Sequence, residues 1–176
     1  MTMALPSLER RIAALEDQLE IRQLVARFVF AVDDRRFGEV AEMFTPGGRF
    51  RYINGTVDLN GRRAIVEHFE ARYLALGLTN HVTHDHVVDF VGPGRAHGRV
   101  SSHVEVCRAN GQAMVTATRF ADVYEREETA TGSAWRFAER ALSVLYYLPA
   151  AEYPALVGQR NRNRSGQEPR AADVGE

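Results

Sequence analysis

The apolar pattern of the chain changes its period once, and this change restricts the fold more than any other feature. Before Gly77, apolar residues recur at three- and four-residue intervals, as in amphipathic helices. After Gly77, long segments with strand character are separated by two turn signals, Gly92-Pro93-Gly94 and Asn110-Gly111. Helices followed by a meander of long antiparallel strands predict an α+β domain, with the helices packed on one face of a curved sheet.

The boundaries of the expected elements follow from caps, turn residues and apolar spacing. The first helix has an apolar face and a potential break near Glu16 and Asp17, which would leave a short leading helix. The expected helices are Ser7 to Arg36, Phe37 to Phe44, and Arg62 to Leu76 with Gly77 as the stop. The expected strands are Arg49 to Tyr52, Val57 to Leu59, His81 to Val91, Arg95 to Ala109, Gln112 to Arg126, and Ala134 to Leu148.

The length of 176 residues suits one domain with a sizeable core. We expect that domain to span residues 1–157. The segment from Gly158 to Glu176 is rich in polar residues and nearly free of large apolar ones, which predicts a disordered tail.

The charge composition excludes several function classes. All 22 basic residues are arginines, and 23 acidic residues balance them to a net charge of −1, so a nucleic-acid binder is not expected. Without lysine, no side chain can form a Schiff base with a carbonyl substrate or cofactor.

The single cysteine, Cys107, cannot form an internal disulfide, which favours a reducing compartment. No apolar run approaches the length of a membrane span, so we expect a soluble cytoplasmic protein without membrane contact.

Two aspartates, Asp33 and Asp34, stand near the C-terminal end of the first helix, where the helix dipole disfavours negative charge. At about 100° per residue, Asp33 lies at the edge of the apolar face and Asp34 on the far side. Asp33 is therefore the one directed toward the interior. The alternative is that both acids only terminate the helix and pair with nearby arginines.

Three of the six histidines, His81, His84 and His86, stand at the start of one expected strand. In an extended chain His84 and His86 share one face and His81 the other, unless a bulge shifts the register. With Asp89 and His97 the pattern resembles a metal site, but Asp89 would lie on the opposite face, so no metal ligation is predicted. The alternative for His84, His86, His97 and His103 is a surface or interface position.

In the last strand, Arg136 and Arg140 interrupt an apolar run and fall on one face. An inward arginine needs a partner. Such an arginine either forms an ion pair with an acid such as Asp122, or provides a binding site for an anion or leaving group.

Several local motifs are similar to those of a known family. They are Phe30-Ala31-Val32-Asp33-Asp34-Arg35-Arg36, Pro46-Gly47-Gly48-Arg49-Phe50, Gly61 before Ala64-Ile65-Val66-Glu67-His68-Phe69, Asn80-His81, Phe120-Ala121-Asp122-Val123-Tyr124-Glu125-Arg126, and Trp135-Arg136-Phe137-Ala138-Glu139-Arg140. From Glu16 to Pro149 the chain resembles SnoaL-like members of the nuclear transport factor 2-like superfamily. Within it, the resemblance is to the branch of scytalone dehydratase and hexachlorocyclohexane dehydrochlorinase.

The resemblance implies a cone-shaped barrel, with three N-terminal helices packed on a strongly curved, mostly antiparallel sheet around an apolar pocket. In that branch a helix-end aspartate bonds a strand-start histidine, and Asp33 and His81 occupy those positions. Arg140 matches an arginine that assists in the dehydrochlorinase. Scytalone itself is not the expected substrate, because Val32 replaces a tyrosine beside the aspartate.

The residues and the resemblance together predict a catalytic set of Asp33, His81 and Arg140, with no metal, flavin or nicotinamide cofactor. Asp33 would fix the tautomer of His81, the base, and Arg140 would stabilise the leaving group. The reaction would be dehydration or dehydrohalogenation of a small apolar cyclic molecule. The predicted pocket residues are the aromatics Phe28, Phe50, Tyr52, Phe69, Tyr73, Phe120 and Tyr146.

Three other hypotheses remain. Asp33 alone could be the base of an isomerase or of a polyketide-type cyclase. The fold could also be a binding or assembly module without catalysis, such as the small subunit of a dioxygenase. In each case we expect a homodimer or homotrimer, because exposed long strands tend to pair with copies of themselves.

Overall fold

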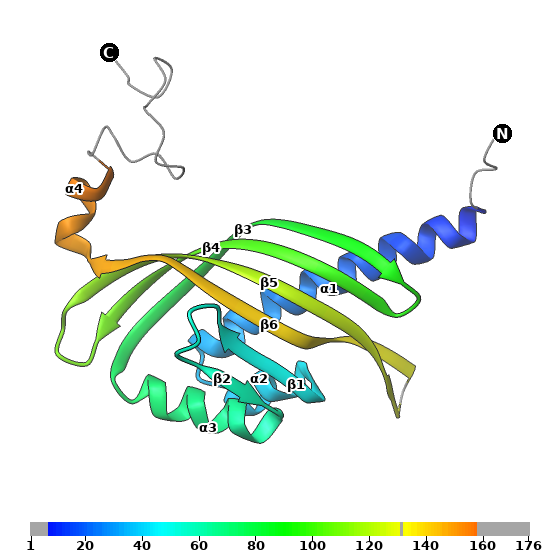
Figure 1. The fold of residues 1–176 in the computed structure, drawn as a ribbon, viewed down its shortest axis with the longest axis horizontal. Helices are drawn as coiled ribbons and strands as arrows, with labels where there is room; N and C mark the ends of the chain where they lie inside the picture. The colour runs from blue at the N-terminus through cyan, green and yellow to red at the C-terminus, as the bar shows by residue number, and fades with distance from the viewer. Residues whose placement is uncertain (1–6, 131, 158–176) are drawn as a thin grey trace, which may run out of the picture.

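The computed structural model describes residues 7–130 and 132–157, and the predicted tail lies outside them. Helices come first and long strands second, as the change of period predicts (Figure 1). The helical elements are α1 (Leu8–Asp33), α2 (Phe37–Glu42), α3 (Arg62–Tyr73), the 3₁₀ helix η1 (Ala150–Glu152) and α4 (Tyr153–Val157). The strands are β1 (Phe44–Tyr52), β2 (Asp58–Asn60), β3 (Leu76–Gly92), β4 (Arg95–Arg108), β5 (Ala113–Thr129) and β6 (Gly132–Pro149).

The six strands form one strongly curved sheet in the order β2-β1-β6-β5-β4-β3. The four long strands are antiparallel neighbours, whereas β1 runs parallel to β6, so the sheet is mixed. The sheet does not close, since β2 and β3 form its two edges. The α+β class is confirmed, and the predicted barrel is open on one side. Figure 1 shows α1 crossing behind the long strands and α3 lying at one end of their curve.

Helix α1 is continuous, and the break predicted near Glu16 and Asp17 is wrong. Ser7 caps its N-terminus by accepting a hydrogen bond from the Arg10 amide at 3.4 Å. Asp17, one of the two residues at the predicted break, and Glu20 bind the sheet instead. The Trp135 indole donates to Asp17 at 3.1 Å, and the Trp135 amide donates to Glu20 at 2.9 Å.

The third helix ends at Tyr73, three residues before the predicted end at Leu76. Strand β3 begins at Leu76, which pairs with Arg108, and Gly77 lies inside the strand and does not stop the helix. Leu76 fits the apolar spacing of the helix and also belongs to the strand. Its pairing with Arg108 on β4 places it in the strand.

The core lies between α1, α3 and the inner face of the sheet. Every second residue of β4 from Ala96 to Val106 points inward, which fits the period of a half-buried strand. The ring of Phe28 on α1 packs edge-on against Phe44, Phe69 and Phe137. These contacts fix the end of α1 that carries Asp33 against the sheet. Within residues 7–130 and 132–157, no helix combines the length and apolar character that a bilayer span requires.

Candidate active site

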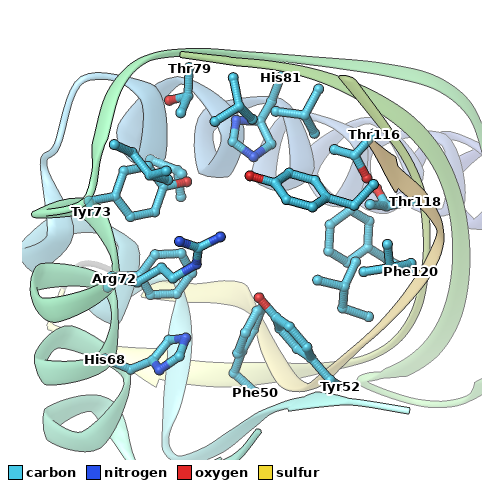
Figure 2. Close-up of a pocket in the computed structure, with 18 of the residues that line it drawn as sticks. Phe50, Tyr52, His68, Arg72, Tyr73, Thr79, His81, Thr116, Thr118 and Phe120 are labelled. Atoms are coloured by element: carbon cyan, nitrogen blue, oxygen red, sulfur yellow. The ribbon is translucent and has the colours of Figure 1, made fainter. Parts of the chain in front are cut away.

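A cavity of about 370 Å³ opens between α1, α3 and the inner face of the curved sheet (Figure 2). This volume lies within the usual range for small-molecule sites. Its walls are mostly apolar, with a few convergent polar groups. The lining consists of Phe28, Val32, Phe50, Tyr52, Asn54, Thr56, His68, Phe69, Arg72, Tyr73, Leu76, Thr79, His81, Val104, Val106, Thr116, Thr118, Phe120, Leu142, Val144 and Tyr147.

The C-terminal end of α1 is neutralised by Arg35, the residue after Asp34. Arg35 has a φ of 62°, unusual for a residue other than glycine, and its side chain folds back on the helix. Its Nη1 donates to the carbonyls of Val32 at 3.1 Å and Asp33 at 3.0 Å, and its Nη2 donates to the carbonyl of Gly77. The guanidinium therefore offsets the negative helix end that the two aspartates would otherwise make worse.

Asp33 and His81 meet, as the sequence predicts. The His81 ring atom Nδ1 lies 2.6 Å from Asp33 Oδ1, and the His81 amide donates to Asp33 Oδ2 at 2.8 Å. The Thr79 hydroxyl donates to Asp33 Oδ1 at 2.7 Å and accepts from Arg35 at 2.8 Å. Two residues at the start of β3 thus hold the carboxylate at the end of α1 by three hydrogen bonds.

Burial on its own would raise the pKa of Asp33. The hydrogen bonds and charge of His81, with the Thr79 hydroxyl, outweigh burial and hold the pKa below its usual value. Asp33 is therefore ionised at neutral pH and can only accept hydrogen bonds, so Nδ1 of His81 carries the proton. The other ring nitrogen, Nε2, has no hydrogen-bond partner among the described residues, and His81 lines the cavity whereas Asp33 does not.

Six of the seven aromatic residues predicted for the pocket line the cavity: Phe28, Phe50, Tyr52, Phe69, Tyr73 and Phe120. The seventh, Tyr146, was assigned wrongly. It pairs with Ala117 on β5, and its ring lies 6.4 Å from that of His103 on the outer face of the sheet. A register shift at Ala117/Thr118 inserts one extra residue in β6, which reverses the alternation of side chains. Tyr147 lines the cavity in its place.

Arg140 does not line the cavity, contrary to the expectation that it would lie inside. It is fully buried, and its Nε lies 3.6 Å from the carboxylate of Asp122, its cross-strand neighbour. Its Cζ lies 4.3 Å from the ring centre of Phe28 and 4.0 Å from that of Phe120. Both rings line the cavity, so Arg140 lies directly behind the cavity wall.

A buried hydrogen-bond chain continues from Asp122. The Tyr124 hydroxyl donates to Asp122 at 2.8 Å and lies 3.1 Å from His86 Nε2. Burial raises the pKa of Asp122, although Arg140 and Tyr124 oppose that shift. Burial, with the charges of Arg140 and Arg22, lowers the pKa of His86 to about 4, so this histidine is neutral at pH 7.

The remaining histidines near β3 lie apart from the Asp33 pair. A bulge between Thr83 and His86 shifts the register of β3 after His81. His84 and His103 are exposed, and His84 Nε2 lies 2.7 Å from His103 Nδ1. His97 pairs across the strands with Asp89. In the part of the chain that the structure describes, no three His, Cys, Asp or Glu side chains form a group that could hold a metal ion.

Sequence reasoning missed several polar residues of the site, among them Arg35, Arg72, Thr79 and Thr118. Arg35 is one of the nearby arginines that the sequence offers only as ion-pair partners of the two aspartates, because nothing in the pattern marks its left-handed backbone. Thr79 lies one residue outside the Asn80-His81 motif. Arg72 and Thr118 each line the cavity from elements on which the sequence predicts only aromatic pocket residues.

A family model described as a SnoaL-like domain matches residues 13–141. The chain belongs to the SnoaL-like family. No curated protein matches the sequence.

Several solved structures share the fold of this chain. Hexachlorocyclohexane dehydrochlorinase LinA superposes with a TM-score of 0.73 at 21% identity, covering 80% of this chain and 94% of LinA. A Novosphingobium aromaticivorans protein provisionally named scytalone dehydratase gives 0.69 at 18%, covering 77% and 88%. A protein from the same organism, described as nuclear transport factor 2-like with a cystatin-like fold, gives 0.62 at 26%, covering 81% and 92%. The predicted superfamily is confirmed.

Proposed function

We propose that this SnoaL-like protein is a cofactor-independent lyase, which removes water or hydrogen halide from a small cyclic substrate. One observation carries the proposal. The 2.6 Å hydrogen bond between Asp33 and Nδ1 of His81 leaves Nε2 as a base on a histidine that lines the cavity. The dehydrochlorinase and the provisionally named dehydratase, which share the fold, act in the same reaction class by their names.

In the proposed step, Nε2 of His81 takes a proton from a carbon of the substrate. The electron pair of that C–H bond forms the new double bond, and the group on the neighbouring carbon departs with its bonding pair. A halide leaves as the anion, whereas a hydroxyl group leaves as water after gaining a proton from the imidazolium. Asp33 stabilises the imidazolium through Nδ1, a task that suits a carboxylate held ionised.

The cavity wall suits a ring-shaped substrate. Aromatic and aliphatic side chains provide most of its surface, including the rings of Phe28 and Phe69, which pack edge to face with their centres 6.1 Å apart. The Thr118 hydroxyl lines this cavity, is shielded from solvent, and has no hydrogen-bond partner in the described residues. Because an unpaired buried hydroxyl is unfavourable, it provides a site for one polar group of a ligand.

The alternative in which Asp33 is itself the base has less support. Asp33 does not line the cavity, and both of its oxygens already accept hydrogen bonds. Its lowered pKa makes it a weaker base still. The binding-module alternative predicts a cavity filled by side chains, and the open volume of about 370 Å³ favours a site that takes a small molecule.

The proposed role of Arg140 is electrostatic support. Its charge acts on the cavity through the rings of Phe28 and Phe120, because the guanidinium does not reach the cavity directly. It would therefore favour negative charge developing on a leaving group near those rings.

The experiment that tests the proposal is an elimination screen over halogenated and hydroxylated ring compounds, with hexachlorocyclohexane among them. Released halide is measured by ion chromatography, and loss of water by mass spectrometry. We expect turnover that disappears in His81→Ala and persists in His84→Ala, a histidine on the exposed side of the sheet. Equal turnover by His81→Ala and the wild type would overturn the proposal.

A further inference from the structure

Arg72 is a cationic residue at the rim of the cavity that the proposed elimination does not use. It stands in the last turn of α3, and Figure 2 shows its guanidinium projecting from the helix toward the middle of the cavity. The last turn of a helix favours a positive charge, but that preference does not require the side chain to point into a cavity. The direction of Arg72 therefore needs its own explanation.

The other arginines of α3 have carboxylate partners, whereas Arg72 has none in the part of the chain that the structure describes. Arg62 lies 3.2 Å from both Glu42 and Glu127, and Arg63 lies 3.2 Å from Glu67. Within residues 7–130 and 132–157, no Asp or Glu oxygen lies within ion-pair distance of Arg72. The guanidinium thus presents its N–H groups to whatever occupies the cavity.

The groups around Arg72 do not neutralise it. Burial raises the pKa of Tyr52, although Arg72 opposes this shift, so the phenol stays protonated at pH 7. Burial and the charge of Arg72 lower the pKa of His68, so the imidazole is neutral. Figure 2 shows Tyr52 and His68 on the side of the cavity that faces away from His81. This side carries one net positive charge together with uncharged donors, a combination that attracts an anion.

We propose that Arg72 binds a carboxylate of the substrate, so that the protein acts on small cyclic carboxylic acids. The guanidinium fork matches two carboxylate oxygens, and the phenol of Tyr52 adds a neutral donor beside it. The ring of the substrate then lies across the apolar wall, with one edge toward His81. The inference rests on the proposed lyase function for the chemistry at His81, but the binding of the acid can be measured without turnover.

The test is calorimetric binding of three matched acid and amide pairs at neutral pH: benzoate and benzamide, naphthoate and naphthamide, and cyclohexanecarboxylate and its amide. Arg72 is exposed, which limits the strength of the contact, so we expect the wild type to prefer at least one acid over its amide by about fivefold. Arg72→Gln should lose that preference. Arg63→Gln is the matched control on the same helix and should keep it.

The inference is overturned if no acid of the set binds more tightly than its amide, or if Arg72→Gln keeps the preference. Its outcome is separable from that of the lyase proposal. An Arg72-dependent preference without turnover of any acid would retain the carboxylate site and remove the lyase. Elimination from a cyclic acid with the same KM in the wild type and Arg72→Gln would retain the lyase and remove the carboxylate site.

Discussion

Two acid–base pairs lie on opposite sides of one cavity wall, and they differ in what surrounds them. Asp33 and His81 keep side-chain exposures of 17% and 15%, and every oxygen of the carboxylate has a partner. Asp122 and Arg140 are both fully buried, and all three guanidinium nitrogens of Arg140 lack a hydrogen-bond partner in the described residues. One pair is well satisfied and touches the cavity, whereas the other is enclosed and poorly satisfied.

This difference separates a pair that can move a proton from a pair that can only hold charge. An imidazole ring can both accept and donate a proton, whereas a guanidinium has no acceptor nitrogen and only donates hydrogen bonds. The open pair therefore suits catalysis. The enclosed pair affects stability and the electrostatic potential behind the wall, and each pair predicts a different response to substitution.

The largest effect on stability is expected from Arg140→Met. The substitution leaves the carboxylate of Asp122 buried without its counter-charge, which should lower the free energy of unfolding by about 3–5 kcal/mol. Urea denaturation measures this loss. The double variant Asp122→Asn/Arg140→Met removes both charges and should recover part of the stability. A loss below about 1 kcal/mol in the single variant would mean that the pair is not enclosed as described.

Gly98→Ala tests the close packing around the same pair. A Cβ at Gly98 would lie 2.5 Å from Cε2 of Tyr124, whose hydroxyl holds Asp122. We expect a loss of about 1–3 kcal/mol, measured by urea denaturation, because the tyrosine must move. Gly47→Ala is the control, since a Cβ there meets nothing within 4 Å. Equal stability of the two variants would contradict the packing.

Thr79→Val tests the hydrogen bonds of the open pair. The substitution keeps the shape and removes the hydroxyl that donates to Asp33, so the free energy of unfolding should fall by about 1 kcal/mol. Thr118→Val is the matched control, because that hydroxyl has no partner in the described chain and its loss should be neutral or stabilising. The comparison would fail if both variants lost the same stability.

The smallest effect is the pH dependence of the open pair. The folded pKa of Asp33 lies below its ordinary value of 3.8, so ionised Asp33 stabilises the fold above that pH, and this contribution is lost as the pH falls through the folded pKa. The wild type should therefore exceed Asp33→Asn in stability at pH 7, and the difference should shrink below about pH 4. Denaturation at both pH values measures it, and a constant difference would contradict the lowered pKa.

Local signals in the sequence predict the fold class and the inward direction of Asp33, whereas the pairing of Asp33 with His81 is implied by the family resemblance. Apolar period marks the helices and strands, and the place of Asp33 at the edge of an apolar face directs it inward. The errors arise where tertiary pairing overrides the local pattern. Tyr146 is turned outward by one extra residue in β6.

Arg140 shows the limit of reasoning from strand parity. Strict alternation places Arg140 on the face opposite Trp135 and Phe137, but a register shift at Val123/Tyr124 brings all three side chains to the buried face. Whether an inward side chain reaches a cavity then depends on the rings of Phe28 and Phe120. These rings come from α1 and β5, and their positions are set by packing between elements. The same holds for Arg72, whose direction at the end of α3 has no signature in the sequence.

The most direct test of the proposed lyase function is kcat/KM on the best substrate of the elimination screen, compared among the wild type, His81→Ala and Asp33→Asn. A base that acts through Nε2 of His81 predicts a fall of about 10²- to 10⁴-fold in His81→Ala, and a large fall in Asp33→Asn, which loses the ionised partner of Nδ1. The account is contradicted if His81→Ala retains most of the activity while Asp33→Asn loses it, since Asp33 would then be the base.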